Sequence, residues 1–115
     1  MFVDSSTKVF FVLGATDMRK GIDSLSLIVS SNDNNPIDGS LYVFCSSNRK
    51  MIKVLYWDKN GFALYQKRLE TDKFLWPKDS HKMIKISIVQ LRWLLDGLNP
   101  LSTKGYKKKL YNSVV

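Results

Sequence analysis

Hydrophobic residues recur along the chain at two spacings, one typical of strands and one typical of helices. A β-branched and aromatic run over residues 8–13 ends at Gly14, which predicts a strand followed by a turn. Apolar positions then recur at intervals of three and four, which predicts a helix with one buried face. These positions are Met18, Ile22, Leu25 and Val29, and the predicted N-cap is Thr16 or Asp17.

Residues 41–69 have the pattern of a small sheet. Strands are predicted at 41–45, 51–57 and 62–69, and Asn60-Gly61 predicts a hairpin turn between the last two. Because side chains alternate across a strand, the predicted pairing separates two faces. One face carries Lys53, Leu55, Trp57, Phe62, Leu64, Gln66 and Arg68, and the other carries Ile52, Val54, Tyr56, Ala63, Tyr65, Lys67 and Leu69.

Two further segments and a second helix complete the predicted architecture. A proline within residues 74–77 predicts a short edge segment, and the run at 83–86 predicts another strand. Ser87 and Gln90 form a capping-box pattern that predicts the start of a helix, and Gly97 predicts its end. The elements together predict an α+β fold: a curled antiparallel sheet of four to six strands with two packing helices.

A length of 115 residues allows one domain with a buried core and is too short for two ordinary domains. We expect this domain to occupy residues 1–100. Residues 101–115 contain four lysines and no acidic residue, which predicts a basic and flexible C-terminal tail. No stretch is apolar enough to span a bilayer, the first residues lack a signal-peptide pattern, and the chain has one cysteine. These features predict a cytoplasmic protein without a membrane partner.

Positive charge is the main chemical feature of the sequence. The chain has 18 Lys and Arg residues against 10 Asp and Glu residues, a net charge of +8 that favours nucleic acid or an acidic protein as a partner. Our hypothesis is a phosphate-contacting surface with two cations in the first turn of the first helix and five at one end of the hairpin. Its residues are Arg19, Lys20, Arg49, Lys50, Lys53, Lys67 and Arg68. The alternative is a solvated helix end, with Arg19 paired to Asp23, and a solvated sheet edge.

Groups suited to catalysis are few. His81 lies in a polar context that predicts a solvated loop residue, and Cys45 ends an apolar strand, which predicts a buried structural thiol. One cysteine and one histidine cannot form a zinc cluster, and most acidic residues fall at turns or helix starts. We therefore predict no catalytic residue, no metal and no cofactor. A small hydrolase or nuclease would have to gather Asp17, Asp58 or Glu70 beside His81.

Three strings resemble a known family. They are "GATDMRKGIDSL" at 14–25, "PIDGSLYVFCSSNRKMIKVLYWDKNGFALYQKRLE" at 36–70 and "FLWP" at 74–77. Over residues 7–98 the chain resembles the small accessory protein called TnpB of the bacterial insertion-sequence family numbered sixty-six, which differs from the RNA-guided nuclease of the same name. Two departures stand out: Ile22 and Ser24 replace the family's usual aromatic residue and glycine, and Cys45-Ser46-Ser47 is less basic than its usual arginine-rich link.

This resemblance implies a role in transposition beside a separate, larger transposase, with no catalytic residue of its own. The predicted function is therefore a non-catalytic accessory protein that assists transposition by binding element DNA, the transposase, or both. The alternative is an interaction adaptor or homodimeric module without direct DNA contact, in which Tyr56 and Tyr65 dock a partner or a second copy. The sequence does not fix the oligomeric state.

Overall fold

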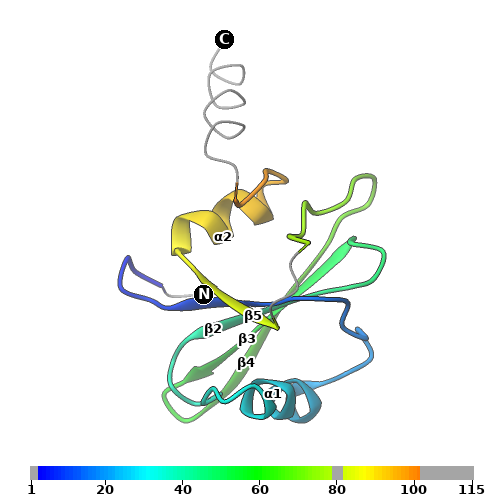
Figure 1. Ribbon diagram of the computed structural model, residues 1–115. Helices are drawn as coiled ribbons and strands as arrows, with labels where there is room; N and C mark the ends of the chain where they lie inside the picture. The colour runs from blue at the N-terminus through cyan, green and yellow to red at the C-terminus, as the bar shows by residue number, and fades with distance from the viewer. Residues whose placement is uncertain (1–2, 79–81, 102–115) are drawn as a thin grey trace.

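A computed structural model describes residues 3–78 and 82–101, which form one mixed sheet with a helix on each face (Figure 1). The elements in chain order are β1 (Val9–Val12), α1 (Ile22–Ser31), β2 (Leu41–Cys45), β3 (Met51–Asp58), β4 (Gly61–Arg68), β5 (Met83–Ile86) and α2 (Ile88–Leu95). The strands lie in the order β4-β3-β2-β1-β5. The α+β class, a single sheet within the predicted strand range and two packing helices are confirmed.

The central strands are buried on both faces of the sheet. Every residue of β2 is buried, because its alternate side chains enter two separate hydrophobic clusters. On one face, Val43 and Cys45 share a cluster with Leu91 of α2. On the other face, Tyr42 and Phe44 share a cluster with residues of α1. Figure 1 accordingly shows α1 and α2 on opposite sides of the sheet.

The direction of one strand pair differs from the predicted antiparallel sheet. β1 and β2 run parallel, whereas the other neighbouring pairs are antiparallel. Parallel neighbours cannot be joined by a tight turn, and α1 supplies the longer crossover between them. As a result the carboxyl ends of β1 and β2 lie at the same end of the sheet, together with the loops that follow them.

The predicted register of the β3–β4 hairpin is confirmed. Trp57 pairs with Phe62 and Lys53 pairs with Gln66, so the two predicted faces are kept. The turn itself consists of Lys59 and Asn60, with Lys59 at a positive φ of 56°, and β4 begins at Gly61.

The start of the first helix was predicted wrongly. α1 begins at Ile22 with Gly21 at its N-cap, and no side chain caps it. The Asp17 carboxylate instead accepts the Arg19 backbone N–H at 2.9 Å, which forms a separate turn before the helix. Arg19 and Lys20 consequently lie in a loop and not in the first helical turn.

The later elements agree more closely with the sequence pattern. The predicted capping box of α2 is confirmed, because Ser87 Oγ accepts the Gln90 N–H at 3.1 Å and Gln90 Oε1 accepts the Ser87 N–H at 2.8 Å. Residues 74–77 form no strand, although the Phe74 N–H donates to the Arg49 carbonyl at 2.7 Å. His81 and residues 102–115 of the predicted tail lie outside the described residues. Within the described residues, no helix is long and apolar enough to cross a membrane.

Candidate nucleic-acid interface

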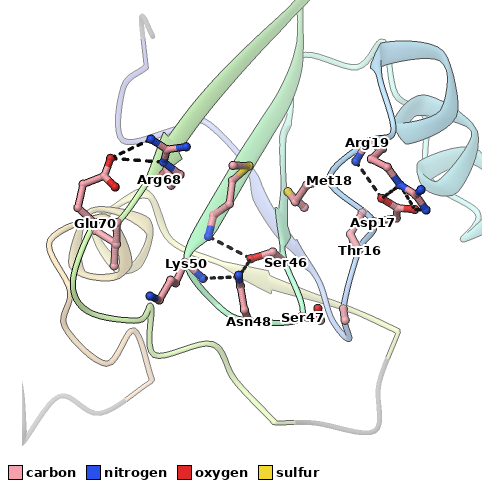
Figure 2. A pocket seen from close by; sticks show the side chains of 13 residues that line it. Thr16, Asp17, Met18, Arg19, Ser46, Ser47, Asn48, Lys50, Arg68 and Glu70 are labelled. Carbon is pink, nitrogen blue, oxygen red and sulfur yellow. Dashed lines mark hydrogen bonds and ion pairs between the residues drawn. The ribbon is translucent and has the colours of Figure 1, made fainter.

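An open hollow of about 810 Å³ lies at the end of the sheet where β1 and β2 terminate (Figure 2). Three segments line it: the loop after β1, the loop between β2 and β3, and the end of β4 with the two residues after it. We call it the sheet-end hollow. Its charged and amide side chains are Asp17, Arg19, Asn48, Lys50, Arg68 and Glu70, and its apolar ones include Met18, Met51 and Leu69.

The β2–β3 loop is held by its own polar side chains. Asn48 Oδ1 accepts the Ser46 hydroxyl at 2.7 Å and the Lys50 backbone N–H at 3.0 Å (Figure 2). Ser46 Oγ in turn accepts the Met51 N–H at 3.0 Å. Arg49 adopts a positive φ of 62°, which turns the chain back toward β3. The short polar residues between the strands therefore set the position of Lys50 at the hollow.

The loop after β1 carries Arg19 on a compact turn. Its Thr16 N–H donates to the Cys45 carbonyl at 2.8 Å, which attaches this loop to the end of β2. The Arg19 guanidinium donates to both oxygens of Asp17, with the shortest contact at 2.7 Å (Figure 2). These hydrogen bonds to Arg19 hold the pKa of Asp17 well below its ordinary value, and the same contacts raise the pKa of Arg19.

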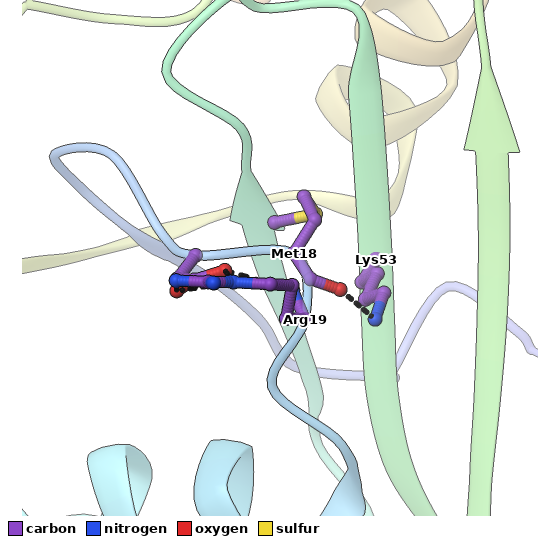
Figure 3. A network of polar contacts seen from close by, with 4 residues as sticks. Met18, Arg19 and Lys53 are labelled. Atoms are coloured by element: carbon purple, nitrogen blue, oxygen red, sulfur yellow. Dashed lines mark hydrogen bonds and ion pairs between the residues drawn. The ribbon is translucent and has the colours of Figure 1, made fainter.

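Lys53 lies inside the fold, although it was predicted to be part of the phosphate-contacting surface. Lys53 is 7% exposed, and its Nζ donates to the Met18 carbonyl at 2.6 Å (Figure 3). The same Nζ donates to the Lys20 carbonyl at 3.0 Å. The ammonium therefore joins β3 to the loop that carries Arg19. We assign it a supporting place behind the hollow, because the residue is buried and two of its three N–H donors already have acceptors.

Lys67 points to the opposite face of the sheet from Lys53 and Arg68. It is half-buried, and its Nζ donates to the Leu95 carbonyl at 2.7 Å. Leu95 is the last residue of α2, where the helix dipole and the free carbonyl groups favour a cation. The charge of Lys67 thus stabilises a helix end on the far side of the sheet.

The seven predicted cations are therefore brought together only in part. Arg19, Lys50 and Arg68 line the sheet-end hollow, with Arg68 paired to Glu70 at 3.1 Å. Lys20 is exposed on the loop after β1, and Arg49 is half-buried beside a smaller neighbouring hollow. The alternative partner predicted for Arg19, Asp23, is wrong, because Arg19 pairs with Asp17.

Several residues of the site were not predicted to belong to the phosphate-contacting surface. Asp17 and Glu70 each pair with an arginine two positions away, a spacing that was visible in the sequence. Asn48 was given no role from the sequence, although asparagine after a strand commonly forms such turns. The two tyrosines of the alternative hypothesis, Tyr56 and Tyr65, pack half-buried against the cluster on the α2 face.

The thiol of Cys45 does not line the sheet-end hollow. Cys45 is fully buried, as predicted, and burial raises the pKa of its thiol to about 12. Among the described residues there is no group of three or more His, Cys, Asp or Glu residues that could hold a metal ion. The polar chemistry of the sheet-end hollow therefore consists of cations, carboxylates, hydroxyls and one amide.

Fold and site together define a small α+β protein with an open hollow at one end of a mixed sheet, lined by three cations and two carboxylates. The chain belongs to the family of IS66 Orf2 like proteins, whose model matches residues 7–105. This confirms the resemblance inferred from the sequence, and it gives the chain an accessory role in the transposition of an insertion sequence.

Two relatives from Sinorhizobium fredii (strain NBRC 101917 / NGR234) are similar over most of their length. "Uncharacterized protein y4hO" is 39% identical over 95 residues, which cover 82% of this chain and 83% of the relative. "Uncharacterized protein y4jC" is 30% identical over 84 residues, 72% of each chain. No solved structure matches the chain.

Proposed function

We propose that this chain is a non-catalytic accessory protein that binds the DNA of its insertion sequence through phosphate contacts at the sheet-end hollow. The observation that carries the proposal is the convergence of Arg19, Lys50 and Arg68 from three separate segments on one open surface. Cations gathered on one face are typical of proteins that bind the nucleic-acid backbone. Lys20 is exposed on the same loop as Arg19 but does not line the hollow.

The carboxylates in the hollow do not block phosphate binding. The side chains of Arg19 and Arg68 are 92% and 64% exposed, so their pairs with Asp17 and Glu70 are solvated surface ion pairs. Such pairs are weakened by solvent and contribute little to stability, and each guanidinium keeps further N–H donors for a second acceptor. We infer that the carboxylates hold the two arginines in place and leave donors for DNA phosphates.

An apolar docking surface has less support. The large hydrophobic side chains that are exposed in the described part of the chain are Leu27, Ile37, Leu75, Val89 and Leu101. They belong to five different segments of the chain, and the two tyrosines proposed to dock a partner are half-buried in a core cluster. The same cations could instead contact the transposase, and the experiment below distinguishes this outcome from DNA binding.

The test compares salt dependence of DNA binding between two charge-matched double variants. The site variant is Lys50→Gln with Arg68→Gln, and the control is Lys59→Asn with Lys85→Gln. Lys59 lies at the opposite end of the β3–β4 hairpin, and Lys85 is exposed on β5. Asparagine is chosen at position 59 because it tolerates a positive φ.

Binding of a labelled duplex is measured by fluorescence anisotropy across a salt series. Each neutralised phosphate contributes about 0.9 to the slope of log affinity against log salt, so the site variant should lose about 1.8 and the control close to nothing. Equal slopes in the two variants, or no salt-dependent binding of the unmodified protein, would overturn the proposal. If binding to the transposase is retained in that case, the result would favour the transposase over DNA as the partner.

A further inference from the structure

A second, smaller hollow adjoins the sheet-end hollow on the other side of the β2–β3 loop. Its volume is about 180 Å³, and it is lined by the loop after β1, the β2–β3 loop and residues 76–78. Ala15, Ser46 and Ser47 line both hollows, so the two cavities meet across this loop. We call the smaller cavity the Arg49 hollow.

The described lining of the Arg49 hollow carries positive charge. Arg49 and Lys78 line it, and no acidic residue is among the lining residues that the structure describes. Neither side chain has an ion pair or hydrogen bond within residues 3–78 and 82–101. Arg19 and Arg68 in the sheet-end hollow, by contrast, are both paired. An anion therefore meets less competition from protein carboxylates in the smaller hollow.

Backbone hydrogen bonds hold the two cations on one local scaffold. The Arg49 N–H donates to the Ser46 carbonyl at 3.0 Å, and the Arg49 carbonyl accepts the Phe74 N–H at 2.7 Å. The second bond attaches the segment after β4, which continues to Lys78, to the β2–β3 loop. Two cations from distant parts of the sequence are thus presented together by ordered backbone.

Trp76, which also lines this hollow, carries a buried hydrogen-bond donor. Trp76 is 7% exposed and stacks on Phe11 with ring centroids 4.7 Å apart. Its indole N–H is buried and has no acceptor in the described part of the chain. Buried donors in proteins nearly always have a partner, and a donor without one commonly marks a bound water or ion.

We propose that the Arg49 hollow binds a phosphate group, with Arg49 and Lys78 as its cationic contacts. The volume of about 180 Å³ lies below the roughly 300 Å³ at which pockets for drug-sized ligands begin, so the hollow suits a group as small as phosphate. As the source of that phosphate we take a phosphodiester of the DNA strand that also contacts the sheet-end hollow; in this respect the inference rests on the proposed function.

The first arm of the test uses inorganic phosphate as the probe. The variant Arg49→Asn with Lys78→Gln removes both charges while keeping a residue that accepts the positive φ at position 49. The control is Lys59→Asn with Lys85→Gln, which matches it in charge and in backbone geometry. The Trp76 indole N–H resonance is followed by NMR during a phosphate titration at constant ionic strength.

We expect a saturable shift of the Trp76 indole resonance in the unmodified protein and in the control, and its loss in the Arg49→Asn/Lys78→Gln variant. Spectra of that variant that otherwise match those of the unmodified protein show that it is folded. An indole resonance that does not respond to phosphate, or one that responds equally in both variants, overturns the inference.

The second arm measures the salt slope of DNA binding with the same two variants. Loss of about 1.8 from the slope in the Arg49→Asn/Lys78→Gln variant alone supports DNA as the source of the phosphate. A phosphate response with an unchanged slope overturns DNA as the source. A phosphate response in a protein that binds no DNA overturns the proposed function and leaves the anion site standing. DNA binding with no phosphate response and an unchanged slope overturns the anion site and leaves the proposed function standing.

Discussion

Lys53 places an ammonium group among buried side chains, where it donates to two loop carbonyls and to no carboxylate in the described part of the chain. Its position on the α1 face of β3 was predicted from the strand pattern, but its partners were not. Those partners, Met18 and Lys20, lie more than thirty residues earlier. The charge thus acts as a fixed support for the loop that carries Arg19.

Replacing Lys53 with methionine should destabilise the protein. The change leaves the carbonyl groups of Met18 and Lys20 without their charged donor, at an expected cost of about 1–3 kcal/mol in the free energy of unfolding. Urea denaturation measures this cost. Lys85→Met, on an exposed position of β5, serves as the control and should change stability by no more than about 0.5 kcal/mol. Equal losses in the two variants would contradict a supporting role for Lys53.

Asp17 should stay ionised in the folded protein at a pH where an ordinary aspartate is half protonated. Its pKa is lowered from 3.8 by the Arg19 contacts, so the ionised form contributes stability above the ordinary pKa. That contribution is lost as the pH falls through the lowered pKa. Arg19→Gln should return the pKa of Asp17 toward 3.8, as followed by NMR of the side-chain carboxyl carbon. An Arg92→Gln variant, changed on α2, should leave the Asp17 titration as it is in the unmodified protein.

Secondary-structure elements were predictable where their signals are local. The β3–β4 register follows from alternation and turn residues within one continuous segment, and the α2 start follows from Ser87 and Gln90. The start of α1 was not predictable in the same way. The pattern of apolar residues continues back to Met18, but the Asp17 turn and the distant Lys53 ammonium hold this segment out of the helix.

The capping box gives a prediction for α2. Ser87→Ala removes the acceptor of the Gln90 N–H, with an expected loss of about 1 kcal/mol in the free energy of unfolding. Ser24→Ala in α1 is the matched control, because Ser24 is exposed inside the helix and alanine is the stronger helix former there. Denaturation of both variants by urea makes the comparison, and an equal change in the two would argue against the cap.

At the scale of the whole molecule, the site depends on which strand ends and loops the topology brings together. Sequence reasoning grouped five cations at the hairpin end, but Lys67 and Arg68 must face opposite sides of a sheet because strand side chains alternate. It assigned Arg19 to the same surface, but no sequence signal explained how Arg19 reaches that end of the sheet. The parallel pairing of β1 with β2, which no local pattern records, brings Arg19 to Lys50 and Arg68.

We also propose that residues 1–100 fold as one domain independently of the basic tail. A chain that ends after Leu101 should keep its free energy of unfolding, because the described residues of the two core clusters all precede Leu101. Loss of the four tail lysines should reduce the salt slope of DNA binding by up to about 3.6 if each contacts a phosphate. Denaturation and anisotropy measure the two quantities. A large loss of stability on truncation would assign the tail to the fold.

The sheet order has a consequence for how the chain reaches this structure during synthesis. β1 lies between β2 and β5, and its residue Val9 pairs with Ile86 near the other end of the described chain. A ribosome must therefore complete nearly all of the domain before β1 acquires both neighbours. Until then the side chains of β1 that face α2 lack their partners in β5 and α2 and stay exposed to water. The β2–β4 meander, by contrast, can form early because its strands are adjacent in the sequence.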